Sequence, residues 1–480
     1  MNNNKLKNIW EKLILIIIDL LSIYLSLILS FYLRKFVIPY IIRGVPPFEQ
    51  RLSYYLYLYW IPPIYLFFNI YHGLYAKTRI FWEDAKEYCI SYFLSFIIVL
   101  TISVFSRESH KISRIVIVLF FINSIWINLL LRYLVKCLLY NFELFKKNVL
   151  IIGAGETGRL LYNSLENDRY LGYKVVCFID KRGEELKNQF DGVEIFSSVD
   201  EFKKGSKDKD IEKVFIAIPS LDSTEMMDLY NKFHRQFKEV VIIPQVRALA
   251  LTNSEIQYFF NNDLLLLTIR NNLNYKINRI FKNIFDYILV ILLIPFFLVI
   301  GLIISVLIKI DSKGPIFYKH LRYSLNGKRI KIYKFRSMYE NSDQKLKEIL
   351  ERDELLREEW EKNYKIKNDP RITKIGKFLR KTSLDEIPQI INVFKGEMSI
   401  IGPRPVVKEE LKKYYHEYSE YFCNIKSGIT GLWQVSGRSD TDYSFRIRSD
   451  LWYVLNWSIW VDVVILLKTI IVVFKGKGAY

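Results

Sequence analysis

Four apolar stretches in the first 140 residues constrain the fold more than any other feature of this chain. A helix needs about 20 predominantly apolar residues to cross the hydrocarbon core of a bilayer. Each stretch comes close to that length, and prolines at positions 62 and 63 interrupt the second. The stretches cover residues 13–33, 54–75, 88–105 and 112–139. We therefore predict a bundle of four transmembrane helices within residues 1–145.

The charge of the chain agrees with a membrane setting. Its formal net charge is +19, and 51% of its residues are hydrophobic. Anionic lipid headgroups and phosphorylated substrates both suit such an excess of Lys and Arg. Because long apolar runs accompany the charge, we expect the lipid bilayer and phosphorylated ligands as partners, and no nucleic acid. Lys12, Arg79 and Lys147 flank the spans at their expected inner ends, which places the rest of the chain on the cytosolic side after an even number of crossings.

A second region, residues 146–267, has the pattern of a Rossmann-like parallel α/β domain. Short β-branched runs at 149–152, 175–179, 214–218 and 240–243 alternate with helical patterns. Gly153, Gly155 and Gly158 follow the first run, and Asp180 closes the second. In dinucleotide-binding folds such glycines admit a pyrophosphate and the acid meets a ribose. The same glycines also serve helix–strand packing, so a nucleotide bound at these four residues and purely structural glycines are both open readings.

The apolar run at residues 284–310 decides the topology of the C-terminal part. Pro295 lies in its middle, where it removes a backbone hydrogen bond and favours a kink. Positive charge on both sides of a span argues that both ends stay in the cytosol. We predict a re-entrant helix over about residues 278–310, with a straight crossing as the alternative. The flanking charges are Lys276, Arg279 and Lys282 before the run and Lys309, Lys313 and Lys319 after it.

The adjacent acids Asp385 and Glu386 are the strongest candidates for chemistry. A phosphoryl-transfer site needs cations for the non-bridging oxygens, a carboxylate to hold a divalent metal, and a nucleophile or base. Two neighbouring carboxylates repel each other unless a metal or arginines offset their charge, and Mg²⁺ prefers oxygen ligands. An Asp-Glu pair by itself is usually a solvated turn. Here basic residues surround it, namely Arg371, Lys374, Lys377, Arg380, Lys381 and, between two prolines, Arg404.

Several ordered blocks resemble one known family. They are Lys334–Met338, Asp369–Thr373, Leu379–Gln389, Gly402–Pro405 and Gly431–Arg438. Together they resemble the bacterial sugar transferase family, the monotopic polyprenyl-phosphate phosphoglycosyltransferases, over roughly residues 274–480. The membrane spans and α/β domain in front look like those of the long-form members.

The resemblance implies a fold and an activity. A mainly α catalytic domain, residues 268–480, would hang from the re-entrant helix at the cytoplasmic face of the bacterial inner membrane. Ile294 replaces the small residue that usually precedes the kink proline. The reaction would move a sugar-1-phosphate from a UDP-sugar donor to undecaprenyl (polyprenyl) phosphate, release UMP, and belong to surface polysaccharide or glycoconjugate assembly. A homodimer is also expected.

The resemblance further implies roles for individual residues. Asp385 would attack the donor to give a covalent phospho-sugar intermediate, and Glu386, with Asp385, would bind Mg²⁺. Arg380 and Arg404 match positions that bind phosphate. Further candidates for phosphate binding are Lys334, Arg336 and Arg438.

Two rival classes remain at this point. A membrane-anchored nucleotide-sugar dehydratase or epimerase would need a Tyr-x-x-x-Lys pair, and Tyr170 and Lys174 have that spacing close to the glycine loop. A non-catalytic membrane scaffold is the other. The identity of the donor sugar does not follow from any of these motifs.

Overall fold

The computed structural model divides the chain into two compact units, Met1–Arg247 and Ala248–Tyr480. Each unit has hydrophobic cores of its own. The structure describes residues 3–106, 111–182, 190, 192–199, 201–202, 211–237, 239–244, 254–259, 264–340, 342, 344, 346, 348, 351, 357, 369–415, 418–437 and 443–475.

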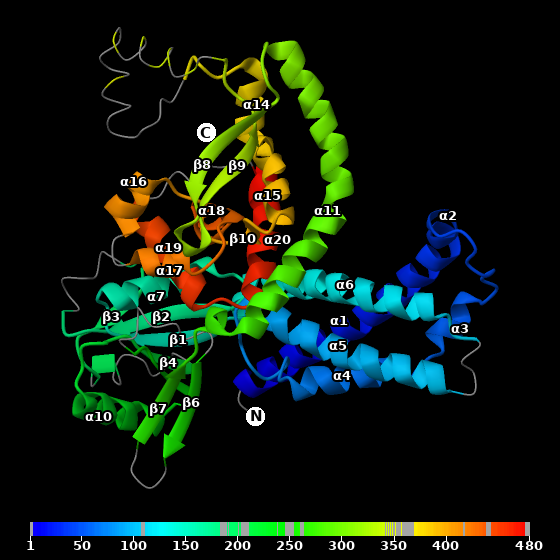
Figure 1. The fold of residues 1–480 in the computed structure, drawn as a ribbon. Helices are drawn as coiled ribbons and strands as arrows, with labels where there is room; N and C mark the ends of the chain where they lie inside the picture. The colour runs from blue at the N-terminus through cyan, green and yellow to red at the C-terminus, as the bar shows by residue number, and fades with distance from the viewer. Residues whose placement is uncertain are drawn as a thin grey trace. The chain divides into compact units, whose positions relative to one another are not determined.

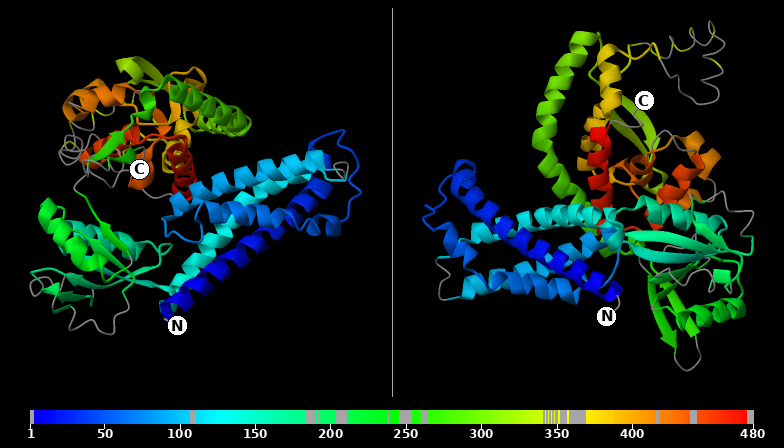
Figure 2. Two further views of the ribbon diagram at one scale, coloured as in Figure 1. Left: turned by 90° about the horizontal axis from the view of Figure 1, so that it is seen from below. Right: turned by 180° about the vertical axis from the view of Figure 1, so that it is seen from behind.

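Three helices of the first unit are long and apolar enough to cross a membrane, Leu6–Ile41, Phe81–Phe105 and Arg114–Asn141. The first combines α1 (Asn3–Tyr32), a π-helical turn at Leu33–Val37, and α2 (Ile38–Ile41). The other two are α5 and α6. These helices lie side by side with α4 in the blue to cyan part of the ribbon (Figures 1 and 2). Ile17, Leu21 and Leu25 are exposed one turn apart on α1, as expected for a stripe that faces lipid.

The expected span over residues 54–75 is not one continuous helix. The segment forms α3 (Leu52–Leu56) and α4 (Ile61–Tyr71), and α4 has 11 residues. At 1.5 Å per residue, α4 is about 16 Å long, roughly half of the hydrocarbon thickness. Pro62 and Pro63 lie in the first turn of α4, where a missing N–H costs no helical hydrogen bond. The prolines therefore begin a short helix instead of kinking a long one. Among the described residues, the fourth helix long enough to span is Lys276–Asp311 in the second unit.

A buried polar network joins the helices of the bundle around Asp19. Its carboxylate accepts hydrogen bonds from Asn69 (3.1 Å), Tyr88 (3.0 Å) and Asn128 (3.0 Å), and Arg132 Nη1 lies 3.3 Å away. Asp19, Asn69, Asn128 and Arg132 are all 1% exposed or less. Buried charges are tolerated when they are paired and hydrogen-bonded, so this network fixes how α1, α4, α5 and α6 pack.

The first unit ends in a five-stranded parallel sheet of order β3-β2-β1-β4-β5. Alternate residues of β1 face opposite cores: Val149 and Ile151 pack with Leu165 of α7, whereas Leu150 and Ile152 pack with Phe233 of α10. The predicted parallel sheet is therefore confirmed, with helices on both faces (Figure 1). The elements are β1 (Lys147–Ile152), α7 (Glu156–Asn167), β2 (Tyr173–Ile179), β3 (Glu194–Phe196), β4 (Lys213–Ile216), α10 (Ser223–His234) and β5 (Glu239–Ile242).

The second unit is built on α11 (Lys276–Asp311), a helix of 36 residues with Pro295 inside. The helix curves along its length (Figure 1). An antiparallel hairpin of β6 (Ser254–Phe259) and β7 (Leu264–Ile269) precedes α11 in this unit. After α11 come β8 (Phe317–Tyr323), β9 (Arg329–Phe335), α14 (Lys374–Thr382), a 3₁₀ helix η6 (Leu384–Gln389), α15 (Ile390–Phe394), β10 (Ser399–Ile401), α16 (Lys408–Glu410), a π-helix η7 (Leu411–Tyr415), α17 (Ser419–Cys423), β11 (Gly428–Thr430), α18 (Leu432–Ser436), α19 (Tyr443–Leu455) and α20 (Ile459–Lys475).

Candidate active site

The tight junction between α14 and η6 positions the two candidate acids. Thr373 begins α14 by accepting a 2.9 Å hydrogen bond from the backbone N–H of Gly376. Ser383 ends it in the left-handed conformation (φ 58°), the one non-glycine residue with positive φ in the described part of the chain. Such a C-cap reverses the chain direction abruptly, so Asp385 and Glu386 follow at once on η6.

Lys334 of β9 lies close to the carboxylates of both Asp385 and Glu386. Its Nζ lies 2.6 Å from Oε1 of Glu386 and 3.9 Å from Oδ2 of Asp385. The side chains of Asp385 and Glu386 are only 13% and 19% exposed. One ammonium group thus offsets two carboxylates in a partly desolvated site, where charge pairing is stronger than in water.

Two predicted arginines complete the charge balance. Nη2 of Arg404 lies 3.9 Å from Oε1 of Glu386. Arg380 donates from Nε to Ser337 Oγ at 3.0 Å. Burial raises the pKa of Asp385, while Lys334, then Arg380 and Arg404, counteract that rise and Glu386 adds to it. The structure therefore brings together Lys334, Arg380, Asp385, Glu386 and Arg404, as the sequence predicted.

A cleft opens beside this group. Besides Lys334, Glu386 and Arg404, its wall includes four polar residues that the sequence reading missed: His320, Arg322, Gln389 and Gln434. His320 and Arg322 alternate on β8, which pairs with β9 in antiparallel register, so strand alternation was a signal that could have found them. Burial and the neighbouring charges of Arg322 and Lys334 lower the pKa of His320.

Arg336, predicted to bind phosphate, contacts backbone carbonyls in the structure and is not among the described residues that line the cleft. Its guanidinium donates to the carbonyl oxygens of Lys313 (2.8 Å) and Ser312 (2.7 Å) and to Ser312 Oγ (2.8 Å). These acceptors lie directly after α11, whose last carbonyls lack partners within the helix. Arg336 is 7% exposed, so it fastens the end of α11. Arg438, the remaining phosphate-binding candidate, lies outside the described residues.

The donor atoms of the site suit a hard cation. Within the described residues, no group of three or more His, Cys, Asp or Glu side chains is placed to hold a metal ion. Asp385 and Glu386 offer carboxylate oxygens side by side in the cleft region. Mg²⁺ typically takes one or two protein carboxylates and keeps several waters, and this donor set fits that preference.

The glycine loop of the α/β domain is shaped mainly by packing. A Cβ on Gly158 would lie 1.9 Å from the carbonyl oxygen of Gly153, which itself has φ +98°, whereas a Cβ on Gly155 would have space. Asp180 accepts hydrogen bonds from the backbone N–H of Ala154 (2.8 Å) and of Arg182 (3.0 Å). Although burial alone would raise the pKa of Asp180, these hydrogen bonds hold it below its usual range. Asp180 therefore ties the loop together.

The pair needed by a dehydratase or epimerase does not assemble. Tyr170 is buried and donates to Asp84 at 2.8 Å, and Asp84 also pairs with Lys136 at 2.7 Å. Lys174 instead pairs with Glu143 at 2.6 Å. Tyr170 thus fastens the α/β domain to α5 and α6 instead of serving a reaction with Lys174.

Comparison with known proteins agrees with this geometry. Residues 277–476 match the profile of the family described as Bacterial sugar transferase, and residues 70–244 match one described as CoA-binding domain. The chain is 35% identical over 478 residues to the UDP-galactose-lipid carrier transferase of Erwinia amylovora, covering 99% of this chain and 98% of the relative. It is 34% identical over 474 residues to the undecaprenyl-phosphate galactose phosphotransferase of Salmonella typhimurium, covering 98% and 97%.

A third relative matches a smaller share of each chain. It is the UDP-glucose:undecaprenyl-phosphate glucose-1-phosphate transferase of Escherichia coli, 31% identical over 343 residues, which cover 70% of this chain and 69% of the relative. The full-length matches extend through the membrane helices and the α/β domain, and the profile match contains the acidic pair. This chain therefore belongs to the bacterial sugar transferase family, as one of its long-form members.

Proposed function

We propose that the protein transfers a sugar-1-phosphate from a UDP-sugar to undecaprenyl phosphate and releases UMP, as the first membrane step of surface polysaccharide or glycoconjugate assembly. The observation that carries this proposal is the convergence of Lys334 and Arg404 on the Asp385–Glu386 pair, where Lys334, Arg404 and Glu386 line one cleft. The names of the relatives supply the substrate classes. They differ between galactose and glucose, so the donor sugar is left unassigned.

The proposed chemistry has two displacements at one phosphorus atom. The Asp385 carboxylate attacks the phosphorus that carries the sugar, forming an acyl phosphate as the bond to the bridging oxygen breaks and UMP departs. A phosphate oxygen of undecaprenyl phosphate then attacks the same phosphorus and displaces the carboxylate, which gives a lipid-linked diphosphosugar. Covalent catalysis replaces one difficult encounter of two anions with two easier steps. Lys334 and Arg404 offset the negative charge in both steps.

We propose that Glu386, together with Asp385, holds Mg²⁺. When bound, the ion would neutralise phosphate charge and orient the donor. Treatment with EDTA is expected to abolish transfer and added Mg²⁺ to restore it. Glu386→Gln should raise the Mg²⁺ concentration needed for half-maximal activity. If EDTA leaves the rate unchanged, the metal assignment is wrong while the acyl-phosphate route stands.

We propose that α11 is a re-entrant helix on the cytoplasmic face, and the contacts at its two ends support the re-entry. Near its start, Asp286 accepts from Ser399 Oγ (2.7 Å) and from the N–H of Ile400 (3.1 Å). At its end, Asp311 accepts from the N–H of Ile375 (3.0 Å). Both ends of α11 thus contact the polar part of the second unit that follows the helix in the chain. The centre of α11 exposes apolar side chains such as Phe296. At 1.5 Å per residue the helix is about 54 Å long, and a straight crossing would put its ends on opposite sides of a ~30 Å core.

A labelling experiment tests this topology. In a variant whose natural cysteines are replaced, single cysteines at Lys276 and Ile310, both exposed, should react with a membrane-impermeant maleimide in inside-out vesicles and not in right-side-out vesicles. Reaction of the two positions from opposite sides would establish a straight crossing. Reaction of both from the periplasmic side would reverse the proposed orientation.

Isotope exchange tests the covalent route. Membranes with the protein should move labelled UMP into the UDP-sugar pool without a lipid acceptor, because UMP release is reversible before the second displacement. Asp385→Asn should abolish both exchange and transfer. Asp228→Asn, at an exposed position on α10, is the matched control and should retain both. Transfer without any exchange in the natural protein would favour direct attack by the lipid phosphate.

The finer architecture is also proposed. The strand order β3-β2-β1-β4-β5 agrees with a Rossmann-type domain. We propose domains at 1–145, 146–267 and 268–480; in the structure residues 248–267 group with the second compact unit. A nucleotide bound at Gly153, Gly155, Gly158 and Asp180 would appear as ultraviolet absorbance released when the purified protein is denatured. The proposed homodimer would appear as twice the chain mass in light scattering of the detergent-solubilised protein.

A further inference from the structure

Three arginines of the second unit have unused hydrogen-bonding capacity. Arg322 and Arg404 each approach one carboxylate at the distance limit of an ion pair, Glu410 at 4.0 Å and Glu386 at 3.9 Å. The guanidinium of Arg446 makes no hydrogen bond or ion pair within the described residues, and its Nε is buried. Because a guanidinium carries five N–H donors and buried polar groups are normally satisfied, these arginines indicate an anionic ligand.

The indole of Trp433 holds two of these arginines together. Arg446 lies 5.1 Å and Arg404 lies 6.0 Å from the centre of its ring. Arg446 also lies 5.0 Å from the ring of Tyr443. Trp433 Nε1 and Tyr443 Oη are buried without a hydrogen-bond partner among the described residues. Stacking fixes a guanidinium plane while leaving its N–H groups free to bind, so the arrangement is prepared for an acceptor.

Arg322 belongs to the same cluster. Burial lowers its pKa, Glu410 opposes that change, and the charges of Arg404 and Arg446 lower it further. Arg322 and Arg404 also line the cleft that contains Glu386. Glu386, Glu410 and Asp450 offset part of the charge of these three cations. Neighbouring guanidinium groups still repel each other, and a bound anion would relieve this repulsion. We call Arg322, Arg404 and Arg446 the arginine cluster.

A shallow pocket with mainly aromatic walls, which also include Asp450, adjoins the arginine cluster. Pro403, which precedes Arg404, and Ile447, which follows Arg446, both line it. Its other walls are mainly aromatic, and Tyr418 and Tyr421 at its mouth are 44% and 41% exposed. The aromatic walls are Tyr415, Tyr418, Tyr421 and Phe422.

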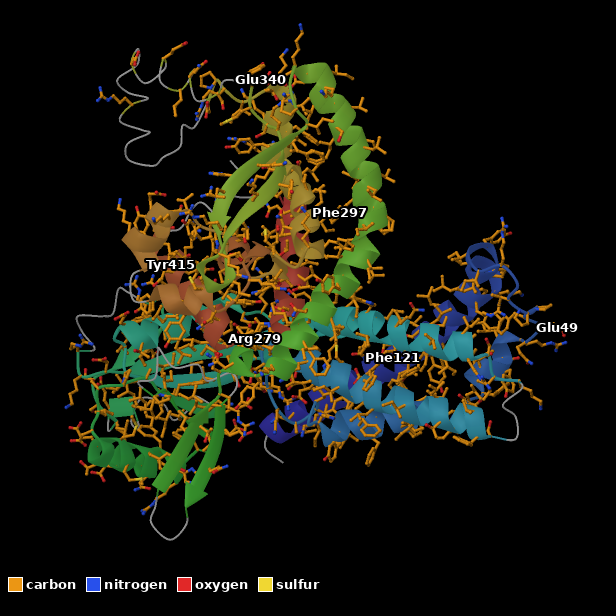
Figure 3. All side chains as sticks on the ribbon, in the orientation of Figure 1. Glu49, Phe121, Arg279, Phe297, Glu340 and Tyr415 are labelled. Atoms are coloured by element: carbon orange, nitrogen blue, oxygen red, sulfur yellow. The ribbon has the colours of Figure 1, made fainter. Side chains whose placement is uncertain are left out.

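The pocket lies on the side of the second unit away from the membrane helix. It is built from η7, α17 and α19, and the labelled Tyr415 lies far from Phe297 of α11 in the side-chain view (Figure 3). A water-soluble ligand can reach this face more readily than a membrane lipid.

We infer that the arginine cluster binds the phosphate that leaves with the nucleoside of the donor, and that the nucleobase stacks against the exposed rings of Tyr418 and Tyr421, which line the aromatic pocket. This inference rests on the proposed function. In that reaction negative charge grows on the departing phosphate, where arginines stabilise it most effectively. Aromatic side chains stack on a base irrespective of its sequence context. Asp385 and Glu386, the arginine cluster and the pocket follow one another in space. In a nucleoside diphosphate sugar, the sugar-bearing phosphate, the nucleoside phosphate and the base follow one another in the same order.

Titration calorimetry of the full chain in detergent tests the inference with UMP and uridine as probes. Arg446→Gln should weaken UMP binding by roughly 10- to 100-fold, the effect of losing hydrogen bonds to a charged group, and leave uridine binding unchanged. Arg448→Gln is the matched control, since Arg448 lies two residues further on the same helix and is exposed. Tyr418→Ala should weaken both ligands. If Arg446→Gln folds poorly, Arg446→Lys is the second variant. It keeps the charge and should retain part of the UMP affinity.

The outcomes separate this inference from the proposed function. Equal UMP affinity in the Arg446 and Arg448 variants, in a protein that still transfers sugar phosphate, overturns the subsite and leaves the function standing. A raised KM for undecaprenyl phosphate with unchanged UMP affinity assigns the arginine cluster to the acceptor and also overturns it. Arg446-dependent UMP binding in a protein that transfers no sugar phosphate supports the subsite and overturns the function.

Discussion

Nζ of Lys282 on α11 lies 2.8 Å from Oδ2 of Asp462 on α20, and both side chains are buried. Asp462 also lies 2.7 Å from Tyr453 Oη and 3.1 Å from Trp457 Nε1. Tyr453 Oη is in turn 3.1 Å from the carbonyl oxygen of Ile401, at the end of the strand that leads to Arg404. This ion pair therefore connects the membrane helix with the backbone that supports the active site.

Removing one partner of this ion pair should lower the free energy of unfolding. Asp462→Asn leaves the buried ammonium of Lys282 without its ion-pair partner, while Asp286 still interacts with it, and we expect a loss of up to about 3–5 kcal/mol in the free energy of unfolding. Lys282→Met combined with Asp462→Asn should recover a large part of that loss. A double-mutant cycle from thermal unfolding measures the coupling. Strictly additive single effects would show that the pair does not stabilise the fold.

Asp385→Asn should abolish transfer and raise thermal stability. Burial raises the pKa of Asp385, so the ionised carboxylate disfavours the folded state at neutral pH. This penalty is complete above the raised pKa and vanishes below the ordinary value near 3.9. The unfolding midpoint of the variant should therefore exceed that of the natural protein at pH 7, and the difference should shrink as the pH falls. If the unfolding midpoint of Asp385→Asn at pH 7 is lower than that of the natural protein, the ionised Asp385 carboxylate does not disfavour the folded state.

Lys334→Gln should move the acid limb of the pH profile. Lys334 lowers the pKa of Asp385 against the effect of burial, and the nucleophile must be ionised. Without the ammonium the pKa rises further, so kcat/KM should begin to fall at a higher pH than in the natural protein, in addition to a reduced plateau. Lys319→Gln, on the exposed face of β8, is the control. If the acid limb does not shift in Lys334→Gln, a group other than Lys334 controls the ionisation of Asp385.

Arg336 and Arg404 should respond differently to the same substitution. Arg336→Gln removes hydrogen bonds to the carbonyls that follow α11, and leaving these acceptors unsatisfied should lower the free energy of unfolding by about 1–3 kcal/mol. Arg404→Gln should barely change stability and should raise the KM for the donor, because this side chain is 40% exposed in the cleft. The reverse pattern would restore Arg336 as a phosphate-binding residue.

Substitutions at Gly155 and Gly158 distinguish a nucleotide-binding glycine loop from a purely structural one. Gly158→Ala would place a Cβ 1.9 Å from the Gly153 carbonyl oxygen, so the α/β domain should unfold at a lower temperature. Gly155→Ala meets only the flexible end of Arg182 at 3.7 Å and should leave stability unchanged. If Gly155→Ala reduces the binding of a nucleotide without changing stability, the loop has a ligand.

The sequence by itself determined the class of the fold and the centre of the site. Long apolar runs identified three membrane helices and α11, because hydropathy over some 20 residues is a local property. The alternation of β-branched and helical segments predicted the parallel sheet for the same reason. The acidic pair with its basic neighbours Lys334, Arg380 and Arg404 came from short ordered motifs.

Only the tertiary structure decided how distant residues are used. Arg336 and Lys334 are two residues apart, yet one fastens the end of α11 and the other meets Glu386. Arg446 and Arg322 come from helices and strands far apart in the chain, and no local pattern marks them as neighbours of Arg404. Contacts between segments remote in sequence depend on packing, and packing is the property that local periodicity does not encode.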